Sequence, residues 1–87
     1  MQTEQQEGLF PIIEIEIEQH IGIENMLTMI YEDFKTEYKI MKVDLEYQGD
    51  NNFGSLLVSL QGKTEENENI IYYLNRNKIN NYIKGYA

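Results

Sequence analysis

The chain has 87 residues, enough for one small domain and too few for a second. Seven basic residues stand against fifteen acidic ones, and the net charge of −8 argues against a nucleic-acid or anionic-membrane surface. There is no cysteine for disulfides or thiolate metal sites, and no apolar run approaches the roughly 20 residues of a membrane span. We therefore expect a soluble, cytoplasmic domain that does not insert into a membrane.

The first ten residues are mostly polar, and Met1 to Gly8 shows no period, which predicts that residues 1–10 are a flexible leader or linker stub. The folded domain is then expected over residues 11–87. Isoleucines alternate with glutamates from Ile13 to Glu18, the two-residue period of a half-buried strand. Pro11 suits the first position of a strand, where its missing N–H is least harmful. The pattern predicts a first strand over Ile12–Gln19.

After Gly22 the apolar period changes to three and four residues, which predicts an amphipathic helix lying on a sheet. The expected buried stripe comprises Ile23, Leu27, Ile30, Tyr31 and Phe34, widened by Met26 and Met29. We interpret the methionine and aromatic side chains as core packing rather than a cofactor site, because flexible thioethers fill irregular gaps in cores.

Residues 45–62, LEYQGDNNFGSLLVSLQG, predict a β-hairpin that leads into a second helix. Upstream of the turn the apolar residues Met41, Val43, Leu45 and Tyr47 alternate with polar ones, as expected for a strand with one face on a core. The residues Gly49–Asn52 accept turn dihedrals. Downstream, the apolar face is expected to continue through Leu56, Val58 and Leu60.

Thr64 is the predicted N-cap of the second helix, because its hydroxyl can accept from the first free N–H groups. Ile70, Ile71 and Leu74, together with Tyr73, form the expected buried stripe, and a final strand is predicted over Ile79–Tyr86. The order strand, helix, strand, strand, helix, strand predicts an α+β, ferredoxin-like βαββαβ sandwich. Its four-stranded antiparallel sheet carries two helices on one face.

The other face of such a sheet is bare and available for self-association. Ile12, Ile40, Phe53 and Leu57 are expected to present apolar surface there. Of these, Ile40, Phe53 and Leu57 are the predicted dimer interface, since a small domain gains from burying a further apolar face.

The side chains that carry chemistry are few. Glu14, Glu16 and Glu18 are expected to form a solvated strand face rather than a cation site, because hard cations need ligands from several segments. The single histidine, His20, is interpreted as a surface residue. No catalytic triad can be assembled and no phosphate-binding glycine loop is present. The sequence thus predicts neither catalysis nor a metal or other cofactor in this chain.

The run Phe53–Gly62, FGSLLVSLQG, preceded by Leu45–Gly49, resembles the NIL domain, whose pattern includes F-G-S-L-x-V-x-L-x-G. The resemblance extends over about residues 12–87. NIL domains are ACT-like, ferredoxin-like modules at the C-terminus of the ATP-binding subunit of methionine-import ABC transporters. The resemblance implies a regulatory domain at the inner face of the cell membrane, with an upstream ATPase domain and a membrane permease as partners. ATP would bind only in that upstream domain.

In this family the domains pair across two ATPase subunits and bind L-methionine near their interface, which inhibits transport. Carried over, the ligand-contacting segment is the start of the second strand, Tyr38, Lys39, Ile40 and Met41. Lys39 stands where an asparagine is common in the family. A lysine can meet an amino acid's carboxylate, but it lacks an amide's acceptor.

Two alternatives to methionine sensing remain open from the sequence. One is an ACT-like sensor of another amino acid, and the other is a dimerisation module without a ligand. An acylphosphatase-like enzyme shares the fold, but its anion-binding arginine in the loop after the first strand has no counterpart. The chain's only arginine is Arg76, near the end of the second helix.

Overall fold

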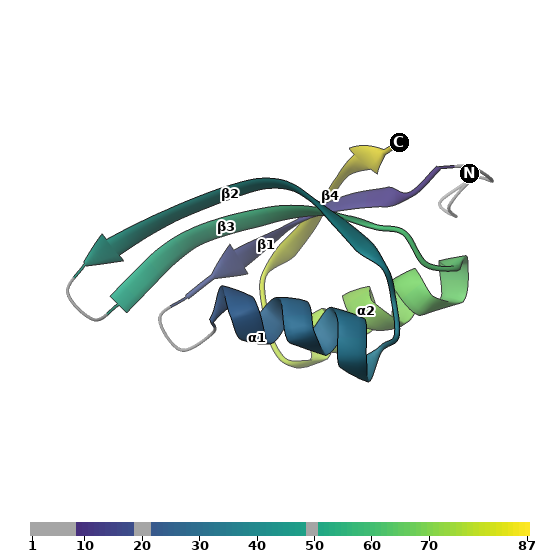
Figure 1. Ribbon diagram of the computed structural model, residues 1–87, viewed down its shortest axis with the longest axis horizontal. Coiled ribbons are helices and arrows are strands. Elements are labelled where there is room, and N and C mark those ends of the chain that lie inside the picture. The colour runs from purple at the N-terminus through teal and green to yellow at the C-terminus, as the bar shows by residue number, and fades with distance from the viewer. Residues whose placement is uncertain (1–8, 19–21, 49–50) are drawn as a thin grey trace.

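The computed structural model describes residues 9–18, 22–48 and 51–87. In chain order its elements are β1 (Pro11–Ile17), α1 (Ile23–Thr28), the π-helical turn η1 (Met29–Asp33), β2 (Tyr38–Gln48), β3 (Asn51–Leu60), α2 (Thr64–Arg76) and β4 (Asn81–Tyr86). The helices lie together beneath one face of a twisted sheet (Figure 1). The predicted α+β, ferredoxin-like fold is confirmed. The first strand, predicted over Ile12–Gln19, begins one residue earlier at Pro11 and ends at Ile17, and Gln19 lies outside the described residues.

The sheet has the strand order β2-β3-β1-β4, and every neighbouring pair is antiparallel. The two central strands carry the buried β-branched residues, while β2 and β4 are the edges. Most of the predicted leader, residues 1–8, lies outside the described residues. Phe10 at its end exchanges two backbone hydrogen bonds with Ala87, of 2.9 and 3.0 Å, so the chain is already attached beside β4 there.

The core lies between the sheet and the helices. Its buried apolar side chains are Ile13, Ile15, Ile17, Met26, Met29, Ile30, Leu56, Val58, Leu60, Ile70 and Leu74. Burying one such side chain contributes roughly 1.5–3 kcal/mol. The interpretation of the two methionines as core packing is confirmed.

The first helix departs from the predicted pattern at its second half. Phe34 donates its N–H to the Met29 carbonyl at 3.2 Å, a bond across five residues that widens the turn. This extra residue per turn rotates Tyr31 away from the core, and its side chain is 61% exposed. The prediction that Tyr31 belongs to the buried stripe is therefore wrong.

The start of α2 also differs from the prediction, because Thr64 is the first helical residue and Lys63 is the N-cap. The Lys63 N–H donates to Glu66 Oε1 at 2.9 Å. One residue earlier, Gly62 and the buried Asn67 side chain exchange two hydrogen bonds of 3.1 Å each. A Cβ on Gly62 would lie 2.7 Å from the Glu66 carboxylate, so glycine leaves room for this cap.

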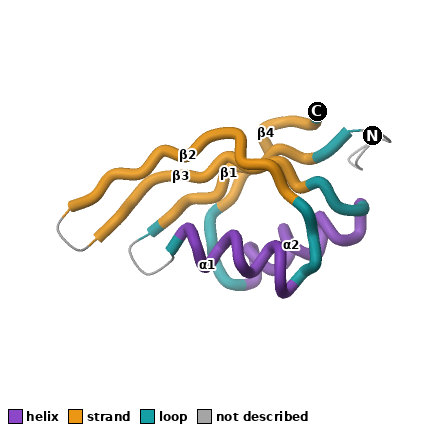
Figure 2. The backbone as a smooth tube through the Cα atoms, in the orientation of Figure 1, coloured by secondary structure: helices purple, strands orange, loops and turns teal. Residues whose placement is uncertain are grey.

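Strands β2 and β3 form an arm that projects past the helices (Figure 2). Asn51 and Asn52, which were predicted to lie in the turn, belong to β3, with Asn51 opposite Gln48. The other predicted turn residues, Gly49 and Asp50, lie outside the described residues. Gly54 has φ +153, and a Cβ there would collide with the Asp44 carbonyl. Only glycine fits where the two strands approach this closely.

The apolar face predicted for β2 is only partly on the core. Leu45 packs against the core, but Met41 and Val43 are 46% and 45% exposed. Met41 sits in a register shift between Ile40 and Lys42, a β-bulge. Val43 lies opposite the buried Leu56, on the correct face, but at the sheet edge. The prediction of a buried face fails for these two residues because β2 is an edge strand of a projecting arm.

Candidate functional site

The predicted ligand-binding segment lies at the start of β2, where the chain leaves η1 and enters the sheet. Tyr38 lies opposite Leu60 and Ile40 opposite Val58, so both face the helix side. Lys39 lies opposite Ser59 and faces the bare side, while Met41 occupies the bulge. Strand alternation therefore divides the four predicted residues between the two faces of one edge.

A shallow, open depression of about 430 Å³ lies beside this segment and is lined by Tyr31, Glu37 and Tyr38. Two phenol rings supply apolar surface, and the exposed Glu37 carboxylate supplies a negative charge. This arrangement suits a small ligand that has an ammonium group and an apolar side chain. Sequence reasoning missed Tyr31, because the π-helical turn that exposes it leaves no apolar-period signal, and it missed Glu37 because the residue precedes the strand.

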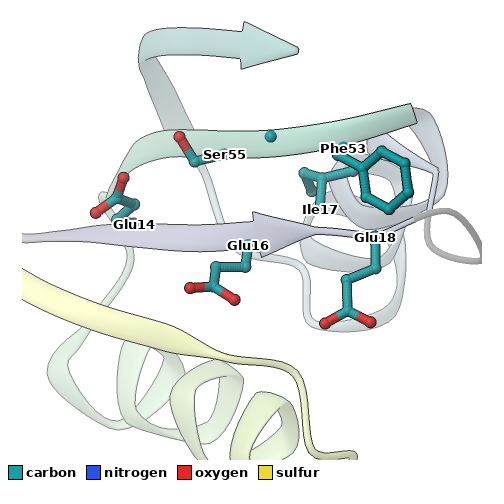
Figure 3. Close-up of a pocket in the computed structure, with 7 residues that line it drawn as sticks. Glu14, Glu16, Ile17, Glu18, Phe53 and Ser55 are labelled. Atoms are coloured by element: carbon teal, nitrogen blue, oxygen red, sulfur yellow. The ribbon is translucent and has the colours of Figure 1, made fainter. Parts of the chain in front are cut away.

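A second, larger groove of about 760 Å³ lies on the bare face, between the glutamates of β1 and the Phe53 side chain of β3. It is lined by Glu14, Glu16, Ile17, Glu18, Phe53, Gly54 and Ser55. Figure 3 shows the Glu16 and Glu18 carboxylates on the side of β1 away from β3. Of the three glutamates only Glu18 is exposed, whereas Glu14 and Glu16 are half-buried.

Two of these glutamates contact β4 and Asn80, the residue just before it. Glu16 accepts hydrogen bonds from Asn80 Nδ2 at 3.0 Å and from the Tyr82 hydroxyl at 3.2 Å. Glu14 forms an ion pair with Lys84 at 3.5 Å. The pKa of the Tyr82 phenol is raised above its usual 10.0. The main cause is the negative charge of Glu16, and the second is the hydrogen bond from the Tyr82 hydroxyl to Glu16. These side-chain contacts stabilise the pairing of the short edge strand β4 with β1.

No cluster of three or more acidic, histidine or cysteine side chains suited to a metal ion occurs within residues 9–18, 22–48 and 51–87. His20 lies outside those residues. In the part of the chain that the structure describes, no helix has the length and apolar character to cross a membrane.

The three predicted interface residues lie on two faces. Phe53 lies opposite Glu46 and Leu57 opposite Glu14, so both are on the bare face, as expected. Ile40 is opposite the buried Val58, so the expectation that it faces the bare side is wrong. Strand parity decides this, because directly opposed residues in antiparallel strands share a face. The fourth expected residue, Ile12, is half-buried on the bare face.

These features define the class of the protein, which is a small ferredoxin-like α+β domain. One face of its sheet is not covered by helices, and a shallow depression lined by two tyrosines and a glutamate lies beside the edge strand β2. The profile of the NIL domain matches residues 11–81, and the chain belongs to the NIL domain family. The resemblance noted over the hairpin is thereby confirmed.

Two relatives carry the name methionine import ATP-binding protein MetN. That of Vibrio cholerae is 25% identical over 80 residues, which cover 92% of this chain and 23% of the relative. That of Photobacterium profundum is 27% identical over 87 residues, which cover 100% of this chain and 25% of the relative. The chain thus spans about a quarter of the length of these relatives, and the sequence has no Walker motif of an ATPase domain.

A solved structure with the same fold is the C-terminal domain of an ABC transporter ATP-binding protein from Enterococcus faecalis. It superposes with a TM-score of 0.71 at 18% identity, covering 87% of this chain and 84% of that one. At this identity the likeness is evidence for the fold.

Proposed function

We propose that this chain is the C-terminal regulatory domain of the ATP-binding subunit of a methionine ABC importer, working in the cytoplasm at the inner face of the cell membrane. The observation that carries the proposal is the match of residues 11–81 to the NIL domain. Relatives named as methionine import ATP-binding proteins support it. The partners are the upstream ATPase domain, the membrane permease and a second copy of the domain.

The ligand of the proposed site is L-methionine, bound at the depression beside the start of β2. Glu37 accepts from the α-ammonium group, and the side chain with its thioether lies against the rings of Tyr31 and Tyr38. Lys39 lies on the other face of this edge strand and does not line the depression, so it reaches the carboxylate by extending its long side chain around the open edge. Ile40 and Met41 complete the segment.

Regulation follows from a shift between two arrangements of the paired domains. A ligand that binds one arrangement more tightly than the other stabilises it in proportion to the difference in affinity. L-methionine bound near the interface of two domains stabilises the arrangement in which transport is inhibited. Import is then regulated by the intracellular concentration of L-methionine, the amino acid that the transporter carries.

The test is calorimetric titration of the purified chain with L-methionine, using D-methionine and L-leucine as comparison ligands. Saturable binding of L-methionine is expected, weakened about 10-fold or more by Lys39→Ala and by Glu37→Gln, because each removes a charge-assisted contact. The matched controls are Lys84→Ala at the opposite edge and Glu68→Gln on α2, and neither is expected to change the affinity.

Three other outcomes would contradict the proposal in different ways. Binding of L-leucine alone would indicate a sensor of another amino acid. The absence of heat for every amino acid, with a dimer in sedimentation, would leave a structural dimerisation module. Binding of L-methionine that both site variants leave unchanged would move the site away from this depression.

A further inference from the structure

The bare face of the sheet carries an exposed phenyl ring. Phe53 stands near the start of β3, on the arm that projects past the helices, and its side chain is 40% exposed. The ring lines the groove of about 760 Å³ on this face. Figure 3 shows it at the same end of the groove as Glu18. No helix covers this half of the sheet, so the ring is open to a ligand that approaches the bare face.

Four carboxylates stand around this ring on the same face of the sheet. Glu46 of β2 lies directly opposite the ring. Glu16 of β1 and Asp44 of β2 lie opposite Ser55, the next residue of β3 on the bare face. Glu18 follows directly after β1 and lines the groove together with the ring. The apolar centre of this surface therefore has an acidic border on both sides.

The lysines of the bare face stand away from the ring. Lys42 lies opposite Leu57, four residues from the ring along β3, which is about 13 Å at roughly 3.4 Å per residue. Lys39 stands three residues before it in β2, and Lys84 forms its ion pair with Glu14, which is also opposite Leu57. Within the described residues no ion pair involves the four carboxylates around the ring. Their negative charges are available to a partner.

An exposed ring with an acidic border is complementary to an arginine side chain. A planar guanidinium group stacks on an aromatic face and donates hydrogen bonds to neighbouring carboxylates at the same time. The groove beside the ring has room for an apolar side chain next to the arginine in the partner's sequence. Phosphate groups of a nucleic acid or of anionic lipids would be repelled, since the chain has a net charge of −8.

The proposed function supplies a partner with this chemistry. Cytoplasmic loops of membrane proteins carry an excess of lysine and arginine. A domain attached to an import ATPase works beside such loops of the membrane permease. The permease loops are therefore complementary in charge to the surface around the ring, whereas the lipid surface between them is not.

We infer that the bare face around Phe53 is a docking surface for an arginine-bearing cytoplasmic segment of the membrane permease. One arginine stacks on the Phe53 ring and pairs with Glu18 and Glu46, and the other two carboxylates attract further basic residues. The choice of partner rests on the proposed function, whereas the chemistry of the surface does not. The depression beside Tyr38 is lined by other residues, so both sites can be occupied at once.

Fluorescence anisotropy of a short labelled peptide in which arginine alternates with leucine tests this chemistry. Saturable binding to the purified chain is expected, and a peptide with glutamine in place of arginine is expected not to bind. Raising the ionic strength from about 0.15 M to about 1 M is expected to weaken binding several-fold, because the screening length falls from about 8 Å to about 3 Å.

Variants of the ring and of its border locate the surface. Phe53→Leu keeps an apolar side chain and removes the aromatic face, and it is expected to weaken binding about 2- to 5-fold. The double variant E18Q/E46Q is expected to weaken binding about 10-fold, since it removes two charge pairs.

The matched controls make the same changes on the helix side of the molecule, at residues that are equally accessible. They are Tyr72→Leu for the ring and E65Q/E68Q for the carboxylates, and neither is expected to change the affinity. The double variant also keeps the test decisive if Phe53→Leu fails to fold.

Peptides copied from the cytoplasmic loops of the permease test the choice of partner. At least one is expected to bind saturably and to bind E18Q/E46Q less tightly than the wild-type chain. If the arginine peptide binds and none of the loop peptides does, the assignment to the permease is overturned.

The outcomes separate this inference from the proposed function. Binding of the arginine peptide that Phe53→Leu and E18Q/E46Q leave unchanged would overturn the docking surface, because the attraction would then come from net charge alone. The absence of binding at low ionic strength would overturn it as well. Neither result bears on L-methionine, whose titration is expected to be the same for Phe53→Leu as for the wild-type chain.

Discussion

Strands β1 and β2 carry the same alternating pattern in the sequence and have different environments in the fold. In β1 each isoleucine from Ile13 to Ile17 is buried, and the glutamates between them lie on the open face. In β2, Val43 faces the same side as the core but remains half exposed. The difference teaches that alternation reports two faces of a strand, whereas position in the sheet decides whether a face is covered.

The largest expected effect contrasts one residue from each strand. Ile15→Ala leaves a cavity in a fully buried site and is expected to lower the free energy of unfolding by about 3–4 kcal/mol. Val43→Ala is expected to cost less than about 1 kcal/mol in the single chain, because water already reaches the side chain. Urea denaturation at a concentration that keeps the chain monomeric measures both. Equal losses would contradict the contrast.

The next effect concerns the backbone of the arm. Gly54→Ala is expected to lower stability by roughly 2–4 kcal/mol, since its Cβ meets the Asp44 carbonyl and its φ disfavours a side chain. Gly85→Ala in β4 is the matched control. Nothing lies within 4 Å of a Cβ there, so a change below about 0.5 kcal/mol is expected. A mild Gly54→Ala variant would mean that β2 and β3 can separate at this point.

A smaller loss is expected at the start of α2. Asn67→Ala removes the two hydrogen bonds with Gly62 and leaves its half-buried N–H and carbonyl without these partners, which costs about 1–3 kcal/mol. Asn69→Ala on the exposed side of the same helix controls for helix propensity. The melting temperatures of the two variants are compared by thermal unfolding. Equal melting temperatures would contradict a stabilising role for the Asn67 hydrogen bonds at the start of α2.

The smallest effect lies at the β4 edge and depends on pH. Because the Glu16 charge raises the folded-state pKa of Tyr82 above 10.0, the contact stabilises the fold below that pH. The stabilisation is lost as pH rises through the folded pKa. Ultraviolet titration is expected to show a late-ionising phenol that disappears in Tyr82→Phe and titrates earlier in Glu16→Gln. Tyr72→Phe is the control and should leave that component in place.

Much of the fold could be predicted from the sequence because local patterns agreed with it. The element order, the buried isoleucines of β1 and the methionines of the first helix all follow from apolar period and residue type. The NIL resemblance extends over about residues 12–87 and is most specific over the hairpin, where close approach of the two strands requires glycine at position 54. Such sterically required residues make a motif specific.

The remaining features of the fold and of the candidate site have no local signal in the sequence, so they could not be predicted from it. The π-helical turn that exposes Tyr31 and the bulge at Met41 each insert one residue, and either insertion changes which way later side chains point. The bulge at Met41 puts Ile40 on the same face as Val43, although uninterrupted strand alternation would put the two residues on opposite faces. The depression beside Tyr38 joins residues from two elements, and only the folded chain brings Tyr31 to Glu37.

The most direct test of the central claim is to follow the backbone amide resonances of the chain while L-methionine is added. Saturable shifts are expected to cluster at Tyr31 and at residues 37–41, and the residues that line the groove between Glu16 and Phe53 are expected to be unaffected. Shifts confined to that groove, or no saturable shift at any concentration of L-methionine, would contradict the central claim.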